Sequence, residues 1–494
     1  MSSQVSNSQK VIKGISSQTL VTIMLGIVEV VYFSIMSRLL SREDFGLFAA
    51  VSAVTTIFMS ISEAGIGSAL IQRKDMNEDY KNTSFTLSLI IGAITAFLLC
   101  FSSGILANVV VGEKLKIPLM LMSITIFVQG MLAVNYAWIR RKLQFLRAGL
   151  IQLSAFLISS VIAIILALKG YGFYAILFKA ITSSLLALII SYFFINTKFH
   201  FCLKKQYIKS IVNFGGWLTA SVILRNIAQQ IDKLLMSRLL SVSILGSYNR
   251  PKEFINQISS HLNGIFDTAL FPVLSGIQDD LIKLQSAFNR SQYYMNLFSM
   301  GLALLFMCNT ELIIRVFFGD EWMDLKPIFQ VLSLSLIFNI NGRLGDCYLR
   351  SLALVHQQFN LRLLQLILNI VAILIGYRYG LIGVAVAFLL ASFLTVFVKV
   401  FYLANKLCLS VYDIFQNVLG GWFYSIFFIP LLVSQYLFMP NTLIFNFLSA
   451  FLYVLLMCLL FIFYPSLIGK KFKEEIHVKI KSRIKGRHCS FQKR

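Results

Sequence analysis

Long apolar runs recur along almost the whole chain, and they constrain the possible folds more than any other feature. We place about fourteen of them, each long enough to cross the ~30 Å hydrocarbon core of a bilayer as a helix. The runs cover residues 15–36, 45–70, 84–104, 118–138, 149–168, 173–195, 211–237, 253–274, 291–310, 328–349, 363–377, 382–403, 414–435 and 442–464. The connections between them are short, which leaves no room for a large catalytic domain outside the membrane.

The composition supports this interpretation. Of the 494 residues, 57% are apolar and 13% are charged. A soluble chain carries about 25% charged residues, because it needs a polar surface around each core. The sequence therefore predicts an all-α polytopic membrane protein.

The net charge of +23 reports topology rather than nucleic-acid binding. Lys and Arg gather at both termini and in alternate connections, most densely in the tail from Lys470 to Arg494. The positive-inside rule then predicts cytoplasmic termini, and the tail is expected to contact anionic membrane lipids. No cleavage site follows the first apolar run, so we expect an uncleaved first helix in a multi-pass plasma-membrane protein.

An internal repeat divides the chain. Residues 36–41 (MSRLLS), followed by Gly46, recur as residues 236–241, followed by Gly246. Both copies end an odd-numbered span, so the two halves share one membrane orientation. We expect two pseudo-twofold-related six-helix bundles (1–200 and 201–405), two further helices (406–465) and a basic cytoplasmic tail (466–494).

Motifs of soluble enzymology are missing. The sequence has no GxxxxGK[ST], HExxH, GxSxG or paired CxxC motif. The seven cysteines show no paired spacing, so we expect free thiols, no metal and no cofactor. These features predict that the protein is not an enzyme.

Ionisable residues inside the spans are the functional candidates, because each costs roughly 2.5–3.5 kcal/mol to insert at the bilayer centre. Span 7 is the richest, since Arg225 and Asp232 lie two helical turns apart on one face and Lys233 lies at its edge. Such a helix must line a water-filled cavity or pair with a neighbour. Arg343 and Asp346 on span 10 could neutralise each other, and Lys399 is expected to snorkel to a membrane surface.

We therefore expect a cationic cavity for an anionic cargo, because Lys and Arg suit phosphate oxygens. Its predicted substrate-binding residues are Arg225, Lys233, Lys179 and Arg343. The carboxylates that could couple transport to H⁺ or Na⁺ are Glu29, Asp232, Asp267 and Asp346.

Several motifs resemble Wzx-type polysaccharide transporters of the multidrug/oligosaccharidyl-lipid/polysaccharide exporter superfamily. They lie at residues 37–46 (SRLLSREDFG), 63–74 (EAGIGSALIQRK), 246–250 (GSYNR), 271–280 (FPVLSGIQDD) and 380–387 (GLIGVAVA).

The resemblance implies a flippase that works by alternating access. Its expected cargo is an undecaprenyl-pyrophosphate-linked oligosaccharide, moved across the bacterial inner membrane for O-antigen, capsule or exopolysaccharide synthesis. Contacts with glycosyltransferases and a polymerase of the same pathway are also expected. The alternatives are a cation-coupled multidrug exporter, a peptidoglycan-precursor flippase and, less favoured, a membrane glycan polymerase or ligase.

Overall fold

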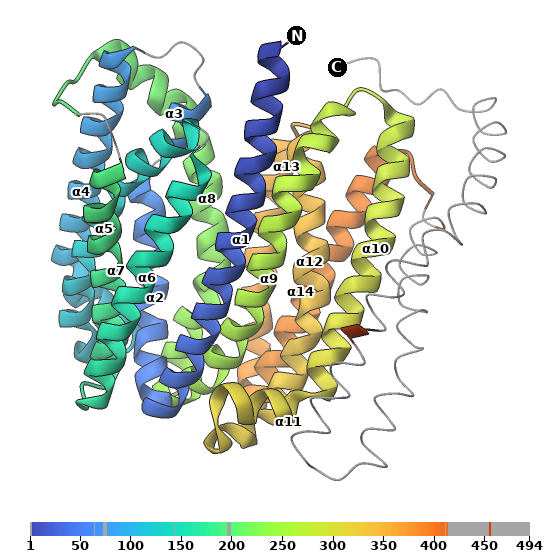
Figure 1. The fold of residues 1–494 in the computed structure, drawn as a ribbon. Helices are drawn as coiled ribbons and strands as arrows, with labels where there is room; N and C mark the ends of the chain where they lie inside the picture. Colours follow the sequence, from blue (N-terminus) through green and yellow to red (C-terminus); the bar gives the residue numbers. More distant parts are fainter. Residues whose placement is uncertain are drawn as a thin grey trace. The chain divides into compact units, whose positions relative to one another are not determined.

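The apolar runs fold into long α-helices, shown as ribbons in Figure 1. The structure is a computed structural model, and it describes residues 2–410 except 64, 73–76, 143 and 195–198, together with residues 412, 454 and 455. The long helices are α1 (Ser2–Leu39), α2 (Arg42–Glu63), α4 (Glu78–Val110), α5 (Lys116–Arg141), α6 (Phe145–Leu168), α7 (Phe173–Phe194), α8 (Lys205–Leu239), α9 (Val242–Gly276), α10 (Leu281–Cys308), α12 (Lys326–Ser351), α13 (Val355–Gly376) and α14 (Gly380–Lys406).

These helices correspond one for one to the first twelve predicted spans, which confirms the all-α polytopic membrane fold. Span 2 is interrupted, because α2 ends at Glu63 and a short α3 (Ile66–Gln72) follows Gly65, whose φ of +62° suits glycine. Predicted spans 13 and 14, and the basic tail, lie outside the described residues.

Short helical segments fill the connections. They are the 3₁₀ turn η1 (Glu113–Leu115), α11 (Thr310–Ile313), the π-helical turn η2 (Ile314–Phe318), and the 3₁₀ turns η3 (Asp320–Leu325) and η4 (Tyr377–Tyr379). Gly112 precedes η1 and Gly319 precedes η3, both with positive φ. The two connections thus enter α5 and α12 in the same way.

Within the described part of the chain, eight helical segments are long and apolar enough to cross a membrane, or nine if the bent pair 281–308 and 310–318 counts as one span. Helices α8 and α9 are not among them. Both carry charged residues along their length, as expected of helices that face a polar interior rather than lipid.

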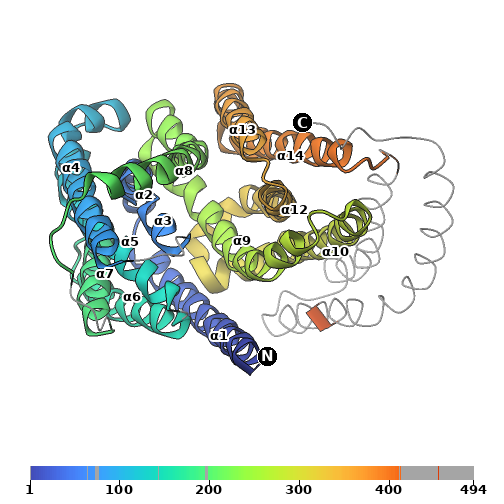
Figure 2. The same ribbon diagram turned by 90° about the horizontal axis from the view of Figure 1, so that it is seen from above.

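The helices group into two compact units. The first contains residues 1–269, 314–332 and 354–395, and the second contains the rest. In the first unit, α4 packs along α5, α6 along α7, α1 along α6, and α2 against both α5 and α8, as Figures 1 and 2 show. The predicted boundary at residues 200 and 201 remains a prediction.

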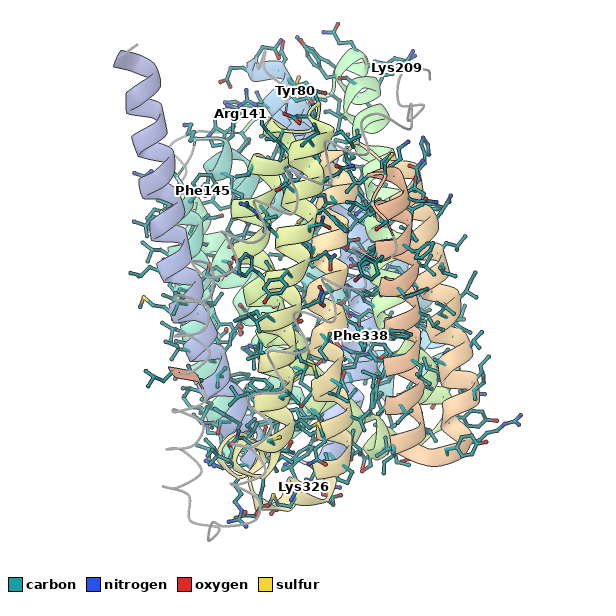
Figure 3. All side chains as sticks on the ribbon, turned by 90° about the vertical axis from the view of Figure 1, so that its right-hand side faces the viewer. Tyr80, Arg141, Phe145, Lys209, Lys326 and Phe338 are labelled. Carbon is teal, nitrogen blue, oxygen red and sulfur yellow. The ribbon has the colours of Figure 1, made fainter. Side chains whose placement is uncertain are left out.

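Figure 3 shows which residues share one end of the first unit. Tyr80, Arg141 and Lys209 lie at one end of the helices, and Lys326 lies at the opposite end. This grouping agrees with the predicted alternation of the connections. We call the end near Lys326 the predicted external end.

The repeated motif forms two matching corners at the predicted external end. One copy joins α1 to α2 and the other joins α8 to α9, and the start of α2 touches the start of α9. A Cβ atom on Gly46 would lie 1.9 Å from the Val242 carbonyl oxygen, and one on Gly246 would lie 1.9 Å from the Arg42 carbonyl oxygen. Arg42 and Val242 are themselves equivalent residues of the repeat, so the contact is reciprocal, as a local pseudo-twofold axis requires. Only glycine allows this approach.

One expectation about cysteine chemistry is wrong. Cys100, Cys202, Cys308 and Cys347 are free, but Cys408 is disulfide-bonded. Spacing along the sequence does not reveal such a bond, because cysteines distant in sequence can meet in the fold.

Candidate functional site

A cavity of about 1080 Å³ lies inside the first unit, lined by residues of α1–α3 and α5–α9. It reaches from Met36 and Phe45, beside the repeated corners, to Gly65 and Arg140 near the opposite end of the helices. Its long axis therefore follows the direction in which the helices are predicted to cross the bilayer.

Seven charged residues line this cavity among those that the structure describes. The cations are Arg140, Lys179, Lys233 and Arg250, and the carboxylates are Glu29, Glu63 and Glu253. The net charge is therefore small, and the function depends on which cations are already neutralised.

Lys179 on α7 is held by aromatic rings. Its ammonium nitrogen lies 4.0 Å from the centre of the Tyr32 ring and 3.7 Å from that of Phe156. Among the described residues, no carboxylate lies within ion-pair distance of it. Aromatic faces attract a cation but leave its charge in place, so Lys179 can still attract an anion in the cavity.

Arg250 on α9 reaches across to α1 in a similar setting. Its Nη2 donates to the carbonyl oxygen of Phe33 at 2.7 Å, and both Nε and Nη2 donate to the Ser37 hydroxyl, at 3.1 and 2.8 Å. The guanidinium carbon lies 3.3 Å from the centre of the Phe33 ring and 4.0 Å from that of Phe45. The side chain is 6% exposed, and again no described carboxylate forms an ion pair with it. Arg250 is therefore a buried cation that is positioned by α1 and not neutralised.

The third deep cation is neutralised. Lys233 on α8 donates to the Glu253 carboxylate on α9 at 3.2 Å. At the other end of the cavity, Glu63 accepts a hydrogen bond from Gln129 at 3.1 Å, and Arg140 is exposed. Glu29 on α1 accepts a hydrogen bond from Gln257 on α9 at 2.6 Å.

The structure divides the predicted substrate-binding residues. It brings Lys179 and Lys233 into one cavity, whereas Arg225 is not among the described residues that line it. Arg343 lies on α12 in the second unit.

The predicted coupling carboxylates are divided as well. Only Glu29 lines the cavity among those whose side chains the structure describes, and the side chain of Asp267 on α9 lies outside that set. Asp232 forms a buried ion pair with Lys252, whose ammonium also lies 3.7 Å from the centre of the Phe388 ring. This pair is sealed between helices and turned away from the cavity lining.

In the second unit, Asp346 pairs with Lys399 on α14 at 2.7 Å, and Lys399 also donates to the Gly342 carbonyl oxygen. Lys399 is 3% exposed, so the expectation that it snorkels is wrong. A carboxylate within reach on the facing helix provides a partner, and the side chain need not extend to the membrane surface.

Sequence reasoning missed Arg250, Glu253 and Arg140. The predicted eighth span starts at residue 253, but α9 begins at Val242 and carries Arg250 into the interior. The repeat held the missing signal, because the second span starts at residue 45 and its copy should start near residue 245.

Comparison with known proteins now identifies the family. The model of a family described as polysaccharide biosynthesis protein matches residues 35–327, which is more than half of the chain. The chain belongs to this family. The resemblance to Wzx-type polysaccharide transporters is thereby confirmed.

Curated relatives are similar to this protein over most of the chain. The lipopolysaccharide biosynthesis protein WzxC of Escherichia coli is 24% identical over 434 residues, which is 87% of each chain. The succinoglycan biosynthesis transport protein ExoT of Rhizobium meliloti is 24% identical over 301 residues, 61% of each chain.

Solved structures show that the family shares its fold with other membrane transporters. The lipid II flippase MurJ matches with a TM-score of 0.71 at 17% identity, covering 91% of this chain and 99% of MurJ. An inward-facing multidrug transporter of the MATE family matches with a TM-score of 0.60 at 13% identity, covering 79% of this chain and 98% of its own.

Proposed function

We propose that this protein flips a lipid-linked oligosaccharide across the bacterial inner membrane by alternating access. The observation that carries the proposal is the pair of cavity cations, Lys179 and Arg250, that aromatic rings hold and no described carboxylate neutralises. The names of its relatives, which include biosynthesis and transport proteins for surface polysaccharides, support the same function.

The cargo that fits these cations is a polyprenyl diphosphate, undecaprenyl pyrophosphate in bacteria, joined to an oligosaccharide. Its diphosphate would meet Lys179 and Arg250, because charge-assisted hydrogen bonds to phosphate oxygens are among the strongest that a protein makes. Cavity hydroxyls and amides, such as Ser183, Gln152 and Asn256, would face the sugars. Of the predicted cationic site, Lys179 and Lys233 stay in the proposal; Arg225 and Arg343 remain candidates from the sequence alone.

Ion coupling also belongs to the proposal. Glu29 lines the cavity, and it is the carboxylate that we assign to H⁺ or Na⁺ coupling. Asp232 and Asp346 each already hold a lysine ammonium in a buried pair, which leaves them poorly placed to take up a second cation.

A multidrug exporter would need a cavity suited to organic cations. Lys179 and Arg250 repel such ligands, so the structure favours an anionic headgroup over a cationic drug. The structural likeness to MurJ extends to the fold alone, and the lipid-linked cargo is therefore assigned from the cavity and the family.

Deleting the gene from its host tests the proposal. We expect the lipid-linked glycan to accumulate in the cytoplasmic leaflet while the surface polymer disappears. Accumulation of the glycan in the outer leaflet would instead indicate a defect in a polymerase or ligase, and would contradict the proposed flipping.

A further inference from the structure

Two ion pairs join α8 to α9 at successive residues, and their surroundings differ. Asp232 pairs with Lys252, and Lys233 pairs with Glu253. The side chains of Asp232 and Lys252 are 2% and 8% exposed, whereas those of Lys233 and Glu253 are 12% and 35% exposed and line the cavity. The first pair is a sealed link between helices, and the second is open to whatever enters the cavity.

Within the open pair, Glu253 is the more accessible member. An anion that enters the cavity is attracted by the Lys233 ammonium but meets the carboxylate that already occupies it. The anion and the Glu253 carboxylate compete for the same short-range, charge-assisted hydrogen bonds from the Lys233 ammonium. Glu253 also follows Arg250 by three residues, so the two side chains share a face of α9 and the carboxylate lies in the region where the proposed headgroup binds.

We propose that Glu253 is a displaceable counter-ion for Lys233. In the empty protein the Glu253 carboxylate lies against the Lys233 ammonium. In the loaded protein a phosphate oxygen of the cargo occupies that position. The inference rests on the proposed function and deepens it by assigning a competitor to the headgroup site.

The cavity then contains two kinds of cation. Lys179 and Arg250 are held by aromatic rings and attract the headgroup without opposition from an ion-pair partner. Lys233 changes partner when the cargo binds and returns to Glu253 when the cargo leaves. Such an exchange lowers the affinity for the bound headgroup and so favours its release, which a transporter needs as much as capture.

The test measures binding of farnesyl diphosphate to the purified full chain in lipid nanodiscs, with farnesol as the ligand that lacks the diphosphate. We expect E253Q to bind farnesyl diphosphate about tenfold more tightly than the wild type, because the competitor loses its charge. E253D retains the charge but shortens the side chain, and its gain should be intermediate.

Two comparisons separate a local counter-ion from a general change of charge. E63Q removes one negative charge from the same cavity at a residue that does not pair with Lys233. Its gain in affinity for farnesyl diphosphate should be clearly smaller than that of E253Q. In a K233M background, adding E253Q should increase the affinity for farnesyl diphosphate by far less than tenfold. An equal gain from E63Q, or a full tenfold gain in the K233M background, would overturn the counter-ion role.

Failure of this inference differs from failure of the proposed function. If the wild type binds farnesyl diphosphate and E253Q binds it no more tightly, only the role of Glu253 is refuted. If the wild type does not prefer farnesyl diphosphate over farnesol, the diphosphate cargo is refuted, and the counter-ion role with it.

Discussion

Single side chains decide how the cavity treats an anion, and Lys179 offers a clear test of this. K179M removes the charge but keeps most of the stem that lies against Tyr32 and Phe156. We expect complementation of a deletion strain to fall at least tenfold while the protein remains in the membrane, since a lost charge-assisted hydrogen bond is worth about 1.5–3 kcal/mol. Surface polysaccharide, measured against protein level, reports the result.

K169M is the matched control for K179M, because Lys169 is exposed at the end of α6 and does not line the cavity. It should complement as well as the wild type. Equal loss in both variants would show that the effect is not specific to the cavity.

The buried ion pair between Asp346 and Lys399 is expected to contribute to the stability of the second unit. K399M removes the ammonium that lies 2.7 Å from the buried Asp346 carboxylate, so it should lower the free energy of unfolding by up to about 3–5 kcal/mol. The double variant K399M/D346L should recover most of this loss. Unfolding in detergent measures both, and equal destabilisation by the single and double variants would contradict the assignment.

Charge alone marked residues that line the cavity but did not indicate their partners, and the roles of these residues in transport remain predictions. The intramembrane charges of Lys179, Lys233 and Glu29 were sufficient to mark them as cavity candidates. The aromatic rings that hold Lys179, and the carboxylate that neutralises Lys233, come from helices far apart in sequence. A single sequence does not specify such pairings.

At the scale of elements, the repeated corners are the most constrained contact of the first unit. G46A places a Cβ atom against the Val242 carbonyl oxygen, and no flexible side chain can yield there. We expect G46A and G246A each to lower the thermal unfolding temperature strongly and to reduce transport. G104A is the control, because its new Cβ would have only Lys116 Cε nearby, at 3.9 Å. Retention of wild-type stability by G46A would contradict the corner contact.

A second set of contacts fixes the segment 314–325 to the first corner. Arg42 donates to both carboxylate oxygens of Asp324, at 2.8 and 2.6 Å, and to the Glu321 carbonyl oxygen. Trp322 donates from its indole nitrogen to the Ser37 carbonyl oxygen at 3.0 Å. These bonds join the predicted external end of α1 and α2 to the start of α12.

We expect R42A to loosen this segment and to increase hydrogen exchange in residues 314–325, and D324A to do the same to a smaller extent because the other Arg42 contact remains. R238A is the control, since it removes an arginine of the second corner that is exposed. Unchanged exchange in R42A would show that the Arg42 contacts do not hold the segment.

At the scale of the whole molecule, hydropathy was sufficient to place twelve long helices in order, because each must bury its backbone polar groups within itself inside a bilayer. Helix limits were less predictable. Helix α9 begins eleven residues before its predicted span, because the buried polar residues Asn249, Arg250 and Lys252 lower the hydropathy of its first three turns. The repeat predicted that both motif copies end an odd-numbered span in one membrane orientation, but the reciprocal glycine contact depends on three-dimensional packing.

Transport itself tests the central claim. The full chain is reconstituted into liposomes that carry a polyprenyl-diphosphate-linked oligosaccharide, and the fraction of glycan that a membrane-impermeant reagent reaches is followed over time. The wild type should move the lipid between leaflets, K179M should slow this movement at least tenfold, and K169M should match the wild type. Equal rates in wild-type, K179M and protein-free liposomes would contradict a cavity that carries a diphosphate headgroup through the membrane.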